Sequence, residues 1–351
     1  MQKLGYLPSL DGIRAISALI VFASHVPGIG TVIPGGLGVT VFFFLSGFII
    51  TSLLRIEFEN KQSIDFRGFY LRRVFRIFPP LYIVLTISLA LGCLGVVGSD
   101  FTTMGAISSF FHFTNYYYIF HGEHVGNLLP GMDVTWSLAI EEHFYLVFPI
   151  LFVLLRKNLD NQTTAFVLAS ICLGVLAWRF HLYSQDNFFP RRIFWATSCR
   201  IDSILFGCIL ALWKNPAIEG IKRLPDSVLA IFLSLSIAAL IASLLPRSFF
   251  FREVIRYTIQ GLALMPIFFL AIAKHDWWIF RILNTRILVG MGKISYTFYL
   301  CHRLFLQLVD HYIENQIALA TIIAFVCAVV FSTLMYFAVE KPMARLRKKL
   351  H

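Results

Sequence analysis

Charged residues are scarce in this 351-residue sequence: Asp, Glu, Lys and Arg make up 14% of it, and 58% is hydrophobic. Ordinary soluble domains carry roughly 25% charged residues. So many apolar side chains cannot all be buried in one soluble core, and we therefore expect many of them to face lipid. The composition excludes an ordinary soluble enzyme and predicts a membrane domain with short loops.

The sequence also lacks paired cysteines. None of its six cysteines forms a C-x-x-C pair, so the spacing indicates neither a disulfide framework nor a zinc site. Small apolar packing residues are the expected role of these side chains, and we expect no metal and no resident cofactor. Internal repeats, low-complexity runs and long linkers are missing too, which predicts a single membrane-embedded domain over residues 1–351.

Ten segments are long and apolar enough to approach the ~20 residues that a membrane-spanning helix needs. The sequence thus predicts an all-α, polytopic helix bundle. The first segment contains Asp11 and Arg14 and has no small-residue cleavage site, so we expect a retained helix rather than a leader peptide. The aromatic stretch 101–132 is interrupted by polar residues and is interpreted as re-entrant or interfacial. The expected spans are 10–27, 36–54, 77–98, 135–155, 163–183, 199–213, 227–245, 255–273, 294–310 and 317–339.

The net charge of +11 is not concentrated in one run, so a nucleic-acid partner is not indicated. With the N-terminus inside, 21 of the 30 lysines and arginines fall in inner segments and 6 in outer ones. This bias predicts a multi-pass protein of the cytoplasmic membrane with both termini in the cytoplasm. The basic inner face would attract anionic lipid headgroups and anionic metabolites. A full crossing by 101–132 would abolish most of the bias.

Ionisable residues inside spans usually face the bundle interior and mark function. Arg14 and His25 are 11 residues apart, which is three helical turns, so both lie on one helix face about 16 Å apart. An anionic group bound near Arg14 could extend an arm towards His25. In the alternative interpretation Arg14 pairs with Asp11 one turn away, and His25 is hydrogen-bonded at the interface.

Three arginines cluster in FYLRRVFRIFPPLY at 69–82, just before an apolar span. Guanidinium groups suit phosphate oxygens, and Arg73 and Arg76 share a helical face. Together with Arg72 they are candidates for binding the phosphate oxygens of a ligand. Anchoring at the inner membrane surface is the alternative.

Acidic residues enter an apolar helix in TWSLAIEEHFYLVFP at 135–149. Ser137 and Glu141 share a helical face, and Trp136 suits an interfacial aromatic belt. Glu141 or its neighbour Glu142 could orient a histidine from another helix or act as a base. The alternative is a carboxylate that serves helix packing, although burying one for packing alone is costly.

Weaker signals come from small residues and a second histidine. The glycines of GGLGV at 35–39, with Ser46 and Gly47, permit close helix approach. His302, in ISYTFYLCHRLF at 294–305, is more often a hydrogen-bonded core histidine when taken alone.

Two further patterns are local. Arg200 and Asp202 are close enough in sequence to form an ion pair. Glu340, Lys341 and Pro342 indicate a helix terminus near the inner membrane surface, since proline often follows the end of a helix. Neither pattern assigns a function by itself.

Together, these stretches resemble the acyltransferase-3 family of integral membrane acyltransferases, of the O-antigen or polysaccharide O-acetylase type. They run in the family's order and cover nearly the whole chain, and we expect no appended SGNH-like hydrolase domain. The matching stretches are LPSLDGIRAISALIVFASH at 7–25, GLGVTVFFFLSGFIIT at 36–51, FYLRRVFRIFPPLY at 69–82, TWSLAIEEHFYLVFP at 135–149, Arg200-Ile201-Asp202, ISYTFYLCH at 294–302 and Glu340-Lys341-Pro342.

The resemblance implies ten helices, a cytoplasmic acyl-CoA donor and a sugar acceptor of polysaccharide, lipopolysaccharide or peptidoglycan at the outer face. It implies that His25 is the catalytic histidine, that Arg14 is its partner, and that Arg73 and Arg76 help to hold the donor. We therefore expect an O-acyltransferase, with acetyl-CoA as co-substrate and a glycan or lipid-linked sugar as acceptor. The supporting residues are expected to be Asp11, Trp136, Ser137, Glu142, Asp202 and His302.

In this hypothesis His25 is the general base on the acceptor hydroxyl, and Glu141 orients it or polarises the hydroxyl. An acyl-histidine intermediate stays open as a variant. A secondary transporter or flippase is the leading alternative, although no two-fold repeat supports it. A second alternative is a non-catalytic membrane subunit, which would tolerate the loss of both His25 and Glu141.

Overall fold

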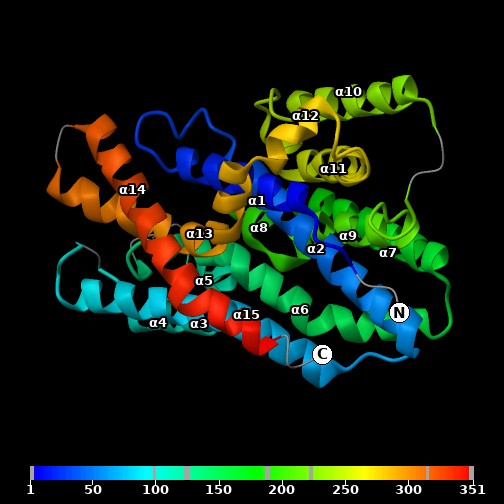
Figure 1. The fold of residues 1–351 in the computed structure, drawn as a ribbon. Coiled ribbons are helices and arrows are strands. Elements are labelled where there is room, and N and C mark those ends of the chain that lie inside the picture. Colours follow the sequence, from blue (N-terminus) through cyan, green and yellow to red (C-terminus); the bar gives the residue numbers. More distant parts are fainter. Residues whose placement is uncertain are drawn as a thin grey trace. The chain divides into compact units, whose positions relative to one another are not determined.

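The computed structural model of the chain describes residues 4–97, 100–121, 127–185, 190–220, 224–313 and 316–347. Within these ranges every regular element is a helix, which confirms the expected all-α class (Figure 1). Among the described residues, six helices are long and apolar enough to cross a membrane by length and composition. The chain is a multi-pass membrane protein, and the expected number of ten crossings stays a prediction.

The helices divide between two compact units, each assembled from separate parts of the chain. Each unit is described here by itself, and the expectation of a single domain over 1–351 stays a prediction. Unit 1 comprises Met1–Ser17, Gly36–Ile64 and Ile140–Val289, and unit 2 comprises Ala18–Gly35, Asp65–Ala139 and Gly290–His351.

Unit 1 is a set of apolar helices packed around α9. Helix α9 contacts α7 and α11, and α11 also contacts α10 (Figure 1). Its main helices are α2 (Gly35–Lys61), α6 (Thr135–Arg156, from Ile140 on), α7 (Asn161–Tyr183), α8 (Pro190–Trp195), α9 (Thr197–Trp213), α10 (Asp226–Ala242), α11 (Arg256–Ala273) and α12 (Trp278–Arg281).

Glycines let α2 and α9 approach closely in unit 1. A Cβ atom added at Gly207 would lie 2.7 Å from the backbone nitrogen of Phe48, and one at Gly47 would lie 2.9 Å from the carbonyl carbon of Ile204. Real side chains do not tolerate such distances to backbone atoms, so the two helices can meet only where a side chain is absent. The close approach expected at Gly47 is therefore confirmed.

Helix starts follow the usual capping chemistry. The Asp160 carboxylate accepts a hydrogen bond from the N–H of Thr163, 2.7 Å away, at the start of α7. Hydrogen bonds from Thr163 hold the pKa of the Asp160 carboxyl below its usual range. Asp65 caps α3 in the same way by accepting from the N–H of Gly68 at 2.9 Å.

Helix α3 (Phe66–Cys93) of unit 2 begins earlier than expected. The expected membrane span began at 77 with the arginine cluster before it, and the structure shows that the helix itself extends back to Phe66. The helix passes through Pro79 and Pro80, because the freed backbone groups of a membrane helix can be satisfied by local adjustment and by neighbouring helices. The arginines therefore lie inside α3, on its first turns.

The segment 101–132 of unit 2 forms two short helices, α4 (Thr103–Phe110) and α5 (Thr114–His121). Each has 8 residues and is about 12 Å long, far too short for a hydrocarbon core of ~30 Å. Neither helix can therefore cross by itself, and the re-entrant or interfacial placement of this segment stays a prediction. Ser88 of α3 holds the end of the segment by donating to the carbonyl of Pro130 at 2.7 Å. Residues 122–126, with the predicted polar Glu123 and His124, lie outside the described residues.

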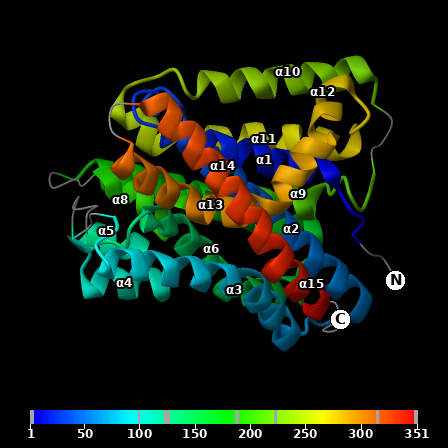
Figure 2. The same cartoon turned by 60° about the vertical axis from the view of Figure 1, so that its left-hand side comes forward.

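Unit 2 ends in one continuous helical run. Helix α14 (Ile317–Met335) continues through a π-helical turn, η5 (Tyr336–Glu340), into α15 (Lys341–Arg347). The predicted helix terminus at Glu340-Lys341-Pro342 was therefore wrong. Pro342 is the second residue of α15, which directly follows the π-helical turn, and this turn breaks the regular α-helical hydrogen-bond pattern there. Helix α15 packs against α3 (Figure 2).

Candidate functional site

Two histidines meet in unit 2. Helix α1 (Pro8–Ser24) ends directly before His25, and His302 is fully buried in α13 (Arg286–Tyr312). Nε2 of His302 lies 3.2 Å from Nδ1 of His25, and the ring centroids are 5.1 Å apart. The sequence pointed to both residues but predicted no contact between positions so far apart in the chain.

The neighbouring carbonyls decide which ring nitrogens carry protons. Nδ1 of His302 lies 2.7 Å from the carbonyl oxygen of Tyr299, and Nδ1 of His25 lies 2.8 Å from that of Val21. A carbonyl oxygen only accepts, so both Nδ1 atoms must donate. Nε2 of His302 then accepts from the single Nδ1–H of His25, which it shares with the Val21 carbonyl in a three-centre hydrogen bond. The protons are assigned from this network.

This assignment leaves Nε2 of a neutral His25 with its lone pair. Among the described residues no hydrogen bond involves that atom, and the His25 side chain is half-buried. An unprotonated ring nitrogen that is partly open to its surroundings can accept a proton from a bound hydroxyl group. The arrangement therefore has the chemistry of a general base held from behind by a second residue.

Aromatic rings pack beside the histidine pair. Phe298 stacks on His302 with an interplanar angle of 18° and a centroid distance of 6.1 Å. The ring centroid of Phe22 lies 5.7 Å from that of Phe298 and 5.3 Å from that of Phe325. These rings keep the buried side of the pair apolar, which strengthens the hydrogen bonds there.

Successive residues of α13 hold other parts of the site. Arg303 pairs with Asp133 at 3.3 Å, and both charges interact electrostatically with His25. Gly131 has a φ of 70° and packs so tightly that an added Cβ would meet the backbone of Leu304. Asp133 and Arg303 were not predicted as site residues, although an arginine inside an expected span was a usable signal.

The start of α6 belongs to the same unit. The Ser137 hydroxyl lies 2.6 Å from the hydroxyl of Tyr299, one turn before His302, so this predicted supporting residue does lie next to the histidine pair's helix. Trp136 is buried, with 8% of its surface exposed. The predicted interfacial belt role of Trp136 was therefore wrong, because a belt residue presents its ring to lipid.

Arg14 lies in unit 1 and pairs with Asp11 at 3.1 Å. Tyr6 donates to the other oxygen of the same carboxylate at 2.8 Å. The pairing considered as an alternative for Arg14 is thus confirmed. The expectation that Arg14 guides a donor arm towards His25 stays a prediction.

Glu141 and Glu142 also belong to unit 1, and both are half-buried. Glu141 accepts a hydrogen bond from the Tyr145 hydroxyl at 2.9 Å, and the oxygen of that hydroxyl lies 3.1 Å from the Ser46 hydroxyl. One turn of α6 thus supplies the carboxylate and the phenol that contacts it. The expected role of Glu141 in orienting His25 stays a prediction.

The three predicted donor-binding arginines lie on α3 in unit 2 and are all partly exposed. A Cβ added at Gly68 would lie 2.8 Å from Nη1 of Arg72, so this guanidinium lies over the capped helix start. Arg73 lies over the ring of Phe69 at 5.8 Å. Their roles in donor binding stay predictions.

Asp202 lies in a buried polar cluster of unit 1. It pairs at 2.8 Å with Arg179 of α7, and both side chains are 0% exposed. Arg200 stacks on the ring of Tyr257, 3.8 Å from its centroid. The ion partner of Asp202 shown here is thus a residue from another helix, where the sequence had suggested the local Arg200. Arg179 was missed as a site residue.

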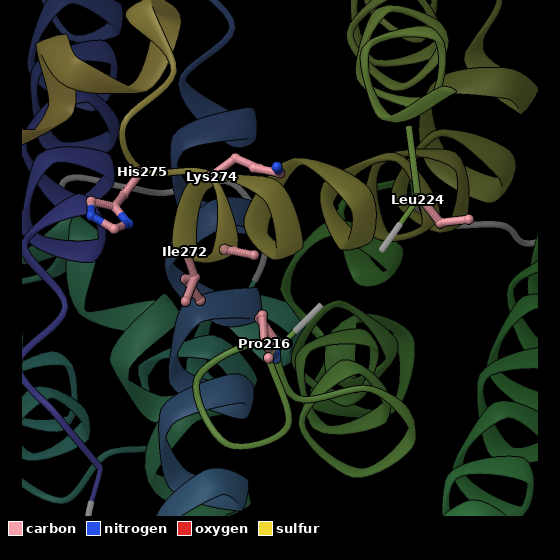
Figure 3. A pocket seen from close by; sticks show the side chains of 7 residues that line it. Pro216, Leu224, Ile272, Lys274 and His275 are labelled. Carbon is pink, nitrogen blue, oxygen red and sulfur yellow. The ribbon is translucent and has the colours of Figure 1, made fainter. Parts of the chain in front are cut away.

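A cavity of about 380 Å³ lies in unit 1, and its lining includes none of the predicted site residues (Figure 3). The ammonium group of Lys274 at this cavity pairs with Asp226 at 2.8 Å. Among the described residues no group of three His, Cys, Asp or Glu side chains could hold a metal ion. The lining residues are Pro216, Gly220, Leu224, Ile272, Ala273, Lys274 and His275.

Comparison with known proteins gives a consistent family. The chain is 30% identical over 364 residues to the O-acetyltransferase OatA of Staphylococcus aureus strain NCTC 8325, and equally to that of strain COL. These matches cover 98% of this chain and 58% of each relative, so the chain spans little more than half the relatives' length. No solved structure matches. The family described as "Acyltransferase domain", acyltransferase-3, matches residues 7–338, and the chain therefore belongs to this acyltransferase family.

Proposed function

We propose that the protein is a membrane O-acyltransferase that moves an acetyl group from acetyl-CoA to a hydroxyl of a cell-envelope sugar. Membership of the acyltransferase family and relatives named O-acetyltransferases support this reaction class. The observation that carries the proposal is the lone pair on Nε2 of His25, which follows from the contacts of Nδ1 with Val21 and His302.

The proposed reaction needs one proton acceptor and one electrophile. His25 Nε2 takes the proton of the acceptor hydroxyl as the oxygen attacks the thioester carbon. The carbon–sulfur bond then breaks, and the imidazolium returns the proton to the leaving thiolate to give free coenzyme A. While His25 is charged, its Nδ1–H remains hydrogen-bonded to Val21 and His302, which stabilises the cation.

The donor enters from the cytoplasm in this proposal. Coenzyme A is a polyanion, and the predicted topology places most of the lysines and arginines on the inner face of the membrane. We propose the cytoplasmic membrane as the location, with both termini inside, and Arg72, Arg73 and Arg76 as donor ligands. Arginine forks bind phosphate oxygens through paired, charge-assisted hydrogen bonds.

The test uses the purified chain in phosphatidylcholine nanodiscs with acetyl-labelled acetyl-CoA and a pool of bacterial envelope glycans. The expected result is release of free thiol in a one-to-one ratio with label that appears on glycan as an alkali-labile ester. Solute movement across vesicles without consumption of acetyl-CoA would instead support the transporter interpretation and contradict the proposal.

A further inference from the structure

The C-terminal helix brings a second group of basic residues to α3. Helix α15 packs along the first turns of α3, both in unit 2 (Figure 2). Arg347 of α15 and Arg76 of α3 interact electrostatically with each other and with Glu340. Two guanidinium groups thus share the electrostatic influence of one carboxylate.

The Glu340 carboxylate already has a hydrogen-bond partner. Glu340 accepts a hydrogen bond from the Thr297 hydroxyl at 2.6 Å. Within the described part of the chain, neither Arg76 nor Arg347 makes an ion pair within 4.0 Å. Nε of Arg347 is buried and has no hydrogen-bond partner among the described residues.

The two guanidinium groups of Arg76 and Arg347 are in an unfavourable environment unless a further anion binds beside Glu340. Like charges held together repel, and a buried N–H that gives up its water without finding an acceptor costs free energy. A tetrahedral phosphate would offer acceptor oxygens to both guanidinium groups at once. Its negative charge would also be greater than the single charge of the Glu340 carboxylate. Phosphate is also the anion that arginine forks match best.

We propose that Arg76 and Arg347 together form a binding site for a phosphate group of the acyl-CoA donor. This inference rests on the proposed function and adds Arg347 to the donor site. An anionic lipid headgroup carries the same phosphate chemistry, so the experiment distinguishes the two sources.

The experiment compares wild type, Arg347→Gln and Arg345→Gln. Arg345 is exposed on the same helix and serves as the matched control for loss of one positive charge. Binding of acetyl-CoA and of acetyl-pantetheine, which lacks the nucleotide phosphates, is measured by calorimetry in phosphatidylcholine nanodiscs. We expect Arg347→Gln to weaken acetyl-CoA binding by about tenfold or more, since hydrogen bonds to charged groups are strong. Acetyl-pantetheine binding and the Arg345→Gln control should change by less than about twofold, because surface charges contribute little.

Three outcomes would overturn the inference. Equal acetyl-CoA affinity of wild type and Arg347→Gln would overturn it while leaving the proposed function in place. Unchanged acetyl-CoA affinity with reduced retention of phosphatidylglycerol from mixed-lipid nanodiscs would assign the site to a lipid headgroup. Failure of wild type to bind acetyl-CoA at all would overturn the proposed function together with this inference.

Discussion

Nε2 of His302 accepts a hydrogen bond from Nδ1 of His25 across 3.2 Å, and so joins the residue after the first helix to a buried position on α13. The contact engages Nδ1 of His25, and among the described residues no hydrogen bond involves its Nε2. Since Tyr299 fixes the proton of His302 in turn, the pair forms a directional chain that ends at Nε2 of His25.

Replacement of His302 tests whether this contact positions His25. His302→Phe keeps an aromatic ring beside Phe298 but removes the acceptor nitrogen. We expect kcat to fall by about 10- to 100-fold with an unchanged KM for the donor, because small misplacements of a catalytic group have effects of this size. The measurement is steady-state acetyl transfer with varied acetyl-CoA.

His302→Gln is the rescue variant for the same position. Its amide oxygen can accept from Nδ1–H of His25, so we expect activity within about tenfold of wild type. ¹⁵N NMR of labelled histidine should show a protonated Nδ1 and an unprotonated Nε2 for His25 in wild type. Equal activity of wild type and the Phe variant, or the opposite tautomer, would contradict the positioning role.

Gly131→Ala tests the tight contact beside Asp133. The new Cβ would be strained at a φ of 70° and would collide with the backbone of Leu304, so both stability and transfer should fall. Gly95→Ala is the matched control, since its φ is 67° but nothing lies within 4 Å of the new Cβ. Thermal unfolding of the control should reflect only backbone strain of about 1–2 kcal/mol. A Gly131→Ala protein as stable as the control would contradict the collision.

The buried pair Arg179–Asp202 makes a prediction about stability. Arg179→Met leaves the Asp202 carboxylate, which is 0% exposed, without its ion partner, and should cost about 3–5 kcal/mol. The double variant Arg179→Met/Asp202→Leu should regain most of this loss, because neither charge then stays buried alone. Denaturant unfolding in detergent measures both proteins. A double variant that is less stable than Arg179→Met would show a specific requirement for the charges.

Local features of the fold and site were predictable from the sequence. The pairing of Arg14 with Asp11 follows from their three-residue spacing on a helix, and the short helices of segment 101–132 follow from its polar interruptions. The helical turns of α3 before residue 77 were not predicted as part of the span, because hydropathy marks only the apolar part of a helix and these turns carry Arg67, Arg72 and Arg73.

Contacts between distant parts of the chain were not predictable. Nothing in the local pattern around His302 distinguishes a core histidine from a partner of His25, which is 277 positions away. The same holds for Arg179, whose pairing with Asp202 depends on how α7 and α9 pack. Such pairs are set by tertiary packing, and the helical periodicity of a single segment contains no information about which other segment it packs against.

The most direct test of His25 as the general base compares acetyl transfer by wild type and by His25→Gln. Binding of acetyl-CoA is measured on the same samples. Glutamine keeps polarity and similar length but has no basic nitrogen. The account predicts unchanged donor affinity with transfer reduced by about 10²- to 10⁴-fold, the usual contribution of a general base. Transfer by a folded His25→Gln protein at the wild-type rate would contradict the assignment of His25 as the base.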